Sequence, residues 1–149
     1  MESLTSLEQL EADESLPEAD QSPLEADQSP LEVDEETLEL ARHIVDVIAD
    51  QKGEDVLLLD IRNVSLLADY FIIGSVNSTR QAKAVIDEVK QETRQTLDVK
   101  PLRIEGDANS GWVLMDYGSV IVHLFTPAMR AYYDLEGLWR GGRIVVRML

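Results

Sequence analysis

Three side chains with useful chemistry lie close together in the sequence: Trp112, Asp116 and His123. They belong to two apolar runs that meet at Gly118. Glycine adopts positive φ without steric cost, so a tight turn here predicts an antiparallel hairpin over 112–125. An indole, a carboxylate and an imidazole on one hairpin are compatible with metal binding, with catalysis or with recognition of a partner.

Side chains alternate between the two faces of a strand, which divides the first run of the hairpin. One face carries a tryptophan, a leucine and an aspartate: Trp112, Leu114 and Asp116. The other face carries Val113, Met115 and Tyr117. An acid beside an indole is typical of a surface that contacts a basic partner, because aromatic residues anchor interfaces and charges at the rim select the partner. A buried, unpaired Asp116 would be costly, which favours a surface position for this face.

Metal binding and catalysis find little support elsewhere in the chain. There is no cysteine, and the two histidines, His43 and His123, are too few for most histidine-rich metal sites. We therefore expect His123 to be a strand histidine that makes local hydrogen bonds. No serine lies in a G-x-S-x-G turn, and no glycine-rich phosphate-binding motif occurs. We expect no catalytic residue, no metal and no cofactor, so the protein is predicted not to be an enzyme.

One enzymatic alternative stays open. A serine directly after an apolar strand, Ser75, is placed like the entrance of a nucleotidyltransferase site, which also needs two acids to hold Mg²⁺. Asp87 and Glu88 point in different directions on a predicted helix and cannot form this pair. A metal-dependent nucleotidyltransferase or phosphohydrolase would instead use Asp60, Asp69 and Ser75.

Charge is distributed very unevenly along the 149 residues. Residues 1–40 contain 14 Asp and Glu and no Lys or Arg, whereas residues 41–149 contain 15 acids and 13 bases. Prolines interrupt a seven-residue near-repeat in the acidic part, which disfavours a continuous helix. We expect residues 1–34 to be a disordered, acidic, low-complexity tail. Residues 35–149 have the size of one domain.

The same charge pattern bears on partners and location. Several bases lie along one predicted helix: Arg80, Lys83, Lys90 and Arg94. The net charge of −16 nevertheless repels a polyanion, so we expect no sequence-specific nucleic-acid binding and prefer a basic protein partner. No apolar run approaches the ~20 residues that span a bilayer, and the acidic N-terminus is the reverse of a transit peptide. We expect no membrane association and a bacterial-type cytoplasm.

The predicted elements follow the order α-β-β-α-β-β-β-α. Helical spacing of apolar residues predicts a first helix over 34–51, and a capping box at Ser78 starts a second. Thr126 followed by proline predicts the start of a closing helix. Strands are expected over 56–61, 70–73 and 101–105 and in the hairpin. The order predicts an α/β fold with a compact mixed sheet of about five strands and helices packed on it, in which Tyr70–Ile73 is a central strand covered on both faces.

Many short motifs of the folded part resemble the Iojap/RsfS family of ribosomal silencing factors. They are Asp60-Ile-Arg62, Asp69-Tyr-Phe-Ile-Ile73, Ser78-Thr-Arg-Gln81, Glu105-Gly106, Trp112-Val-Leu-Met-Asp-Tyr-Gly118, Val122-His-Leu-Phe125, Arg130-Ala-Tyr-Tyr133 and Leu135-Glu-Gly-Leu-Trp139. The resemblance covers about residues 38–141. The sequence departs from the family pattern at two places. Ser119 stands where an acid is usual, and Gly141-Gly142 replaces the usual pair of an acidic and a small residue.

This resemblance implies a function as well as a fold. It implies a nucleotidyltransferase-like but non-catalytic domain that forms a homodimer. It also implies binding to ribosomal protein L-fourteen on the large subunit, which would sterically block the joining of the ribosomal subunits and repress translation under nutrient or energy limitation. The partner-facing residues that it implies are Trp112, Leu114, Asp116, Tyr117, Tyr70 and Glu105.

Overall fold

The computed structural model describes residues 34–149, so the predicted tail lies outside the described residues except for Asp34. The helices are α2 (Glu35–Asp50), α3 (Thr79–Leu97), α4 (Pro127–Tyr133) and α5 (Leu135–Leu138). The strands are β3 (Glu54–Asp60), β4 (Tyr70–Ser75), β5 (Arg103–Glu105), β6 (Trp112–Asp116), β7 (Val120–Phe125) and β8 (Arg143–Met148). No helix in this part of the chain is both long and apolar enough to cross a bilayer.

The strands form one mixed sheet in the order β5-β6-β7-β4-β3-β8. The β4–β7 pair is parallel and the other neighbouring pairs are antiparallel. Strand β4 lies inside the sheet and every one of its residues is buried, as the continuous apolar run predicts. The α/β class and the mixed sheet are therefore confirmed.

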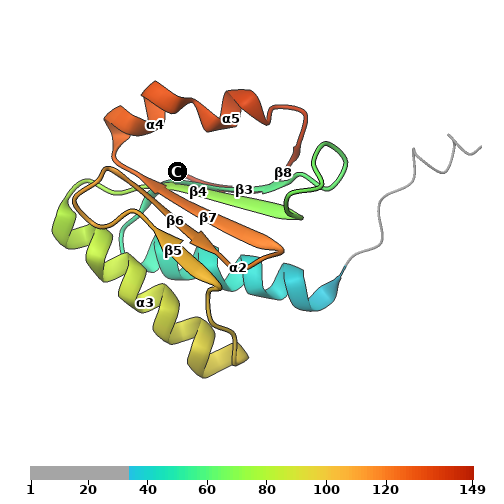
Figure 1. Cartoon of the computed structure of the whole chain (residues 1–149), viewed down its shortest axis with the longest axis horizontal. Coiled ribbons are helices and arrows are strands. Elements are labelled where there is room, and N and C mark those ends of the chain that lie inside the picture. The colour runs from blue at the N-terminus through green and yellow to red at the C-terminus, as the bar shows by residue number, and fades with distance from the viewer. Residues whose placement is uncertain (1–33) are drawn as a thin grey trace, which may run out of the picture. The chain divides into compact units, whose positions relative to one another are not determined.

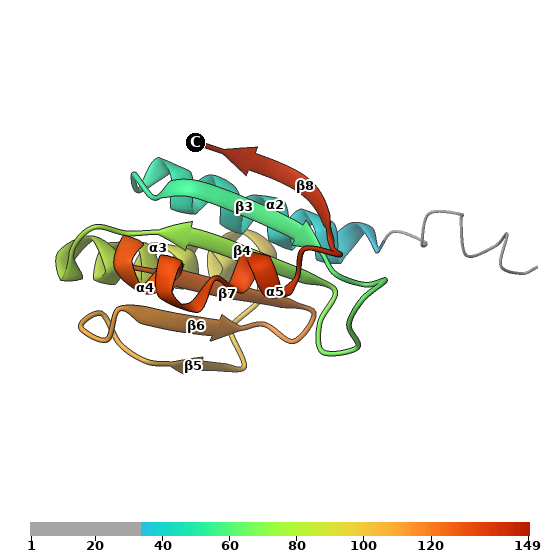
Figure 2. The same ribbon diagram turned by 90° about the horizontal axis from the view of Figure 1, so that it is seen from above.

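Helices cover both faces of the sheet. Figure 1 shows α2 and α3 on one face and α4 and α5 on the other. Figure 2 shows the short helices lying over the middle of the sheet and leaving β5 uncovered on their side. The larger apolar core lies under α2 and α3, and a smaller one lies under α4 and α5. The edge formed by β5 and β6 is therefore accessible on the α4/α5 face.

The sheet has six strands, against an expectation of about five, and β8 is the strand that the sequence does not predict. The side chains of β8 are exposed or half-buried. The strand is fixed by the rest of the sheet instead: it pairs with β3, and Arg143 Nη2 donates to Asp60 Oδ2 at 3.1 Å. A strand at a sheet edge carries a weak apolar pattern, which explains the omission.

The predicted helix starts agree with the structure. Asp34 accepts hydrogen bonds from the first turn of α2, Ser78 Oγ accepts from Gln81 N, and Thr126 Oγ1 accepts from Met129 N. The closing helix is in fact two short ones. Asp134 adopts a left-handed conformation at φ 45°, which ends α4, and its side chain accepts from Gly137 N at the start of α5.

Candidate functional site

The predicted hairpin forms as β6 and β7. Gly118 has φ 87°, and Tyr117 N donates to Val120 O at 2.9 Å to close the turn. Burial along β6 alternates, so Trp112, Leu114 and Asp116 are half-buried on the α4/α5 face, and the residues between them are buried. The sheet pairs Glu105 of β5 with Leu114.

Trp112 packs between the sheet and α4. Its ring is stacked on Phe125 with centroids 5.0 Å apart and lies 4.6 Å from the ring of Tyr133. Its indole Nε1 donates to His123 Nδ1 at 3.2 Å. The indole therefore both fills space beneath α4 and exposes part of its surface.

His123 is 4% exposed, and its ring centroid lies 6.0 Å from that of Trp112. Accepting the indole N–H at Nδ1 is the local hydrogen bond expected of this histidine, and it requires the neutral ring with its proton on Nε2. Nε2 is buried without a hydrogen-bond partner among the described residues. Burial lowers the pKa of His123 from 6.5 to about 4.

The His123 pKa predicts how stability depends on pH. The unfolded chain takes up a proton near pH 6.5 and the folded chain only near pH 4, so stability is lost as pH falls through this interval. Between pH 7.5 and 4.5 the wild type should lose about 2.5 kcal/mol more than His123→Asn, which does not titrate. Urea unfolding across this range measures the difference. Parallel pH profiles for the two chains would contradict the prediction.

A shallow pocket of about 220 Å³ opens beside Trp112 at the uncovered edge of the sheet. It is lined by Glu105, Gly106, Trp112 and Leu114. Three residues predicted for partner binding thus line one hollow, with an apolar floor and an acidic rim. This arrangement suits a partner that inserts an apolar or cationic side chain.

Arg103 links the two carboxylates of this region. Its Nε lies 3.1 Å from Glu105 Oε2 and 3.3 Å from Asp116 Oδ2. Asp116 Oδ1 also accepts from Gly118 N at 2.7 Å, so this carboxylate stabilises the hairpin turn. The Asp116 side chain is thus paired, so the free-energy cost of an unpaired buried acid does not apply to it. Arg103, Glu105 and Asp116 together carry one net negative charge.

The two predicted tyrosines lie elsewhere. Tyr117 is buried on the α2/α3 face, where its hydroxyl lies 3.0 Å from Thr93 Oγ1 and burial raises its pKa. Tyr70 is buried on the same face beneath the Arg62 guanidinium, 5.5 Å from the ring centroid, and burial likewise raises its pKa. The structure does not bring these two tyrosines to the surface that holds Trp112 and Leu114.

Two residues that were not predicted extend this surface onto α4. Tyr133 contacts Trp112, and Tyr132 lies edge-on to Tyr133 with ring centroids 5.0 Å apart. Tyr132 is 78% exposed. Adjacent tyrosines after Thr126-Pro127 were visible in the sequence, but only the packing of α4 shows that they join the hairpin. We call the combined surface the docking face, made of Glu105, Trp112, Leu114, Asp116, Tyr132 and Tyr133.

The enzymatic alternative finds no assembled site. Asp60 is paired with Tyr70 at the start of β4, whereas Ser75 is at its end, a separation of about 17 Å at ~3.3 Å per residue. Asp60 binds Arg62 and Arg143, and Ser75 Oγ accepts from Arg130 Nη1. Within residues 34–149 no three Asp, Glu or His side chains are arranged to hold a metal ion.

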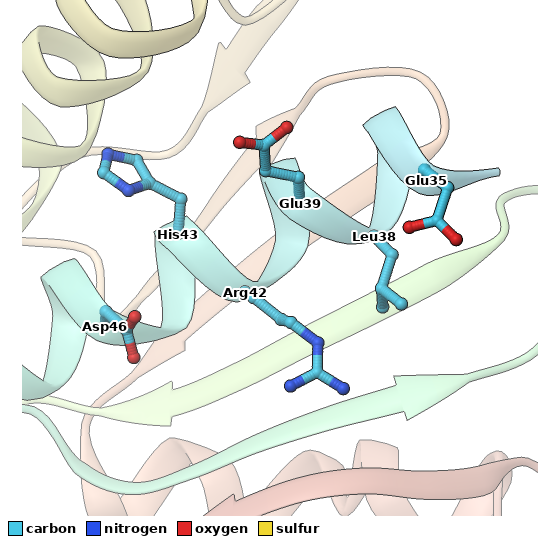
Figure 3. Close-up of a pocket in the computed structure, with 6 residues that line it drawn as sticks. All are labelled: Glu35, Leu38, Glu39, Arg42, His43 and Asp46. Carbon is cyan, nitrogen blue, oxygen red and sulfur yellow. The ribbon is translucent and has the colours of Figure 1, made fainter. Parts of the chain in front are cut away.

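A second hollow, of about 470 Å³, lies on the outer side of α2. Figure 3 shows that its lining comes from that helix alone: Glu35, Leu38, Glu39, Arg42, His43 and Asp46. The acids there are spread over three helical turns and do not converge. This hollow therefore offers no candidate active site.

The fold and the surface around Trp112 together define a class of protein: a mixed α/β domain with an accessible aromatic and acidic surface at one edge of its sheet. The comparisons give the family. Residues 34–147 match the RsfS family, described as ribosomal silencing factor during starvation, and the chain belongs to this family. The prediction of a ribosomal silencing factor, rather than an enzyme, agrees with this family.

Similar proteins share most of the described part of the chain. Ribosomal silencing factor RsfS from Halalkalibacterium halodurans is 42% identical over 96 residues, 64% of this chain and 80% of the relative. The Bacillus subtilis protein of the same name is 41% identical over 90 residues, 60% of this chain and 75% of the relative. A crystal structure from Chromobacterium violaceum has a TM-score of 0.66 at 33% identity, covering 76% of this chain and 92% of the other. Relatives named for chloroplasts and mitochondria match as well.

Proposed function

We propose that this protein binds the large ribosomal subunit through ribosomal protein L-fourteen and sterically blocks subunit joining, repressing translation under nutrient or energy limitation. Family membership supplies the ribosomal role. The observation that supports the contact itself is the docking face, where an indole, a leucine and two tyrosines are accessible beside Glu105. Aromatic anchors with an acidic rim fit a basic ribosomal protein.

The experiment that tests this function uses purified ribosomal subunits. The protein should sediment with large subunits and not with small ones. Added before the two subunits are mixed, it should reduce formation of the joined ribosome in a sucrose gradient, because the occupied surface is the one that the small subunit needs. Unchanged subunit joining at saturating protein would refute the proposed mechanism.

We also propose that the protein is a homodimer and acts in a bacterial-type cytoplasm. The family resemblance supports the dimer, and relatives from bacteria support the location. Sedimentation velocity at several concentrations tests the dimer, which should give twice the mass of one chain. A concentration-independent single-chain mass would refute it.

The acidic N-terminal segment, which we propose to be a separate disordered tail, yields another prediction. Deleting residues 1–33 removes ten carboxylates and keeps the Asp34 cap of α2. We expect an unchanged melting temperature and a changed salt dependence of large-subunit binding, because the lost charges act at long range and are screened by salt. Differential scanning calorimetry and sedimentation at 50 and 300 mM KCl measure the two effects. Loss of the melting transition would contradict the prediction.

A further inference from the structure

A basic groove lies on the sheet face opposite the docking face, between the outer side of α3 and the edge strand β5. Its volume is about 650 Å³. Its charged lining consists of Lys90, Arg94, Lys100 and Asp87, and its apolar lining includes Pro101 and Ile104. The helical residues follow the spacing that places side chains on one face of a helix, and the others come from the link between α3 and β5.

Positive charge in this groove is little neutralised by the protein itself. Lys90 and Lys100 form no ion pair with a described residue. Arg94 reaches Asp98 only at 3.7 Å, and both side chains are exposed, so this pair contributes little. The single acid, Asp87, lies 3.7 Å from Lys83, which is outside the groove.

Several other bases of the domain form ion pairs with carboxylates. Those ion-paired on the far side of the sheet or at its β3–β8 edge are Arg62, Arg130, Arg143 and Arg147. The groove differs from these sites because three bases and only one acid line the same hollow. A mixture of cations with an apolar floor suits a ligand that carries regularly spaced negative charges and also flat or apolar parts.

The groove and the docking face share one strand. Ile104 lines the groove, while its neighbour Glu105 lines the pocket beside Trp112. Alternation along β5 sends these two side chains to opposite faces of the sheet. A ribosomal protein bound at the docking face would therefore bring the surrounding ribosomal surface to the groove as well.

We propose that this groove binds the phosphodiester backbone of RNA next to the docking site on the ribosome. The proposal rests on the proposed function, which places the groove beside a polyanion. Docking raises the effective concentration of that RNA, so the groove contact can offset the repulsion from the net charge of the chain. Lysine side chains that contact phosphate groups do not read the bases, so this contact is not sequence-specific.

The test compares two full-length variants that lose the same charge. The groove variant is Lys90→Gln with Lys100→Gln, and the control variant is Arg42→Gln with Lys52→Gln, which lies outside the groove. Sedimentation with large subunits is measured from 50 to 300 mM KCl. The groove variant should bind less tightly at low salt, and the slope of log K against log salt should become shallower by roughly 1.4 to 2. The control variant should change the slope much less.

A second arm separates this proposal from the proposed function. Fluorescence anisotropy with a labelled single-stranded oligoribonucleotide at low salt reports on the groove without the ribosome. Weaker RNA binding by the groove variant alone supports the proposal even if the wild type does not bind large subunits. Equal behaviour of the two variants in both arms would overturn the proposal. Binding to a labelled polyglutamate peptide is measured in the same way, and a groove variant that loses binding to this peptide but keeps binding to RNA would also overturn it.

Discussion

Replacing Glu105 with lysine and Leu114 with alanine in one chain should weaken binding to the large ribosomal subunit by about 100-fold or more. Both side chains line the pocket of the docking face and they are paired across β5 and β6. A central apolar contact and a rim charge facing a basic partner are each capable of hot-spot effects of ~2 kcal/mol or more. Sedimentation with purified large subunits at fixed salt measures the loss.

The matched control makes the same chemical changes on the opposite side of the sheet. Leu38→Ala with Glu39→Lys alters a leucine and a glutamate of α2, whose positions are seen in Figure 3. This control should bind as the wild type does. If the docking variant and the control bind equally well while both remain folded, the assigned surface is wrong.

Trp112→Ala is a less selective probe of the same surface. The indole is stacked on Phe125 and donates to His123, so its removal disturbs the core beneath α4 as well as the exposed edge. Asp116 has a similar double role because it caps the hairpin turn. Substitutions at Glu105 and Leu114 separate binding from folding more cleanly.

Asp60→Asn should lower the free energy of unfolding at pH 7 by about 2 to 3 kcal/mol. Burial of the Asp60 carboxyl opposes its ionisation, but hydrogen bonds from Arg62, from the Arg62 backbone and from Arg143 outweigh burial and lower its pKa to about 2. A drop from 3.8 to about 2 corresponds to ~2.4 kcal/mol of preference for the charged form. Asparagine cannot provide this charge and leaves two guanidinium groups facing an amide.

The pH dependence distinguishes this carboxylate from His123. The folded pKa of Asp60 is depressed, so its contribution is complete above about pH 4 and is lost as pH falls toward 2. The gap between wild type and Asp60→Asn should therefore stay constant from pH 7.5 to 4.5 and narrow below that. Asp107→Asn, at an exposed loop position, serves as the control and should change stability by less than ~0.5 kcal/mol. A gap that already closes at pH 5 would contradict the assignment.

Local signals in the sequence determined most of the secondary structure. The residues before each long helix have side chains that accept hydrogen bonds from its first turn, and such bonds depend on neighbours a few positions away. The hairpin is equally local, because Gly118 and the alternation along β6 suffice to place Trp112 and Leu114 on one face. Family membership of residues 34–147 also agrees with the motifs that the sequence displays.

Only the tertiary structure decided which of the predicted residues reach the surface. Tyr117 directly follows the strand that begins with Trp112, yet α3 covers the tyrosine, whereas part of the tryptophan stays accessible. Strand β8 exists because β3 offers pairing groups and Asp60 binds Arg143, two contacts that span more than 80 residues. Tyr132 and Tyr133 join Trp112 only because α4 folds back over the sheet. A pattern of nearby residues fixes local geometry, whereas burial and pairing between distant segments depend on how the elements pack in space.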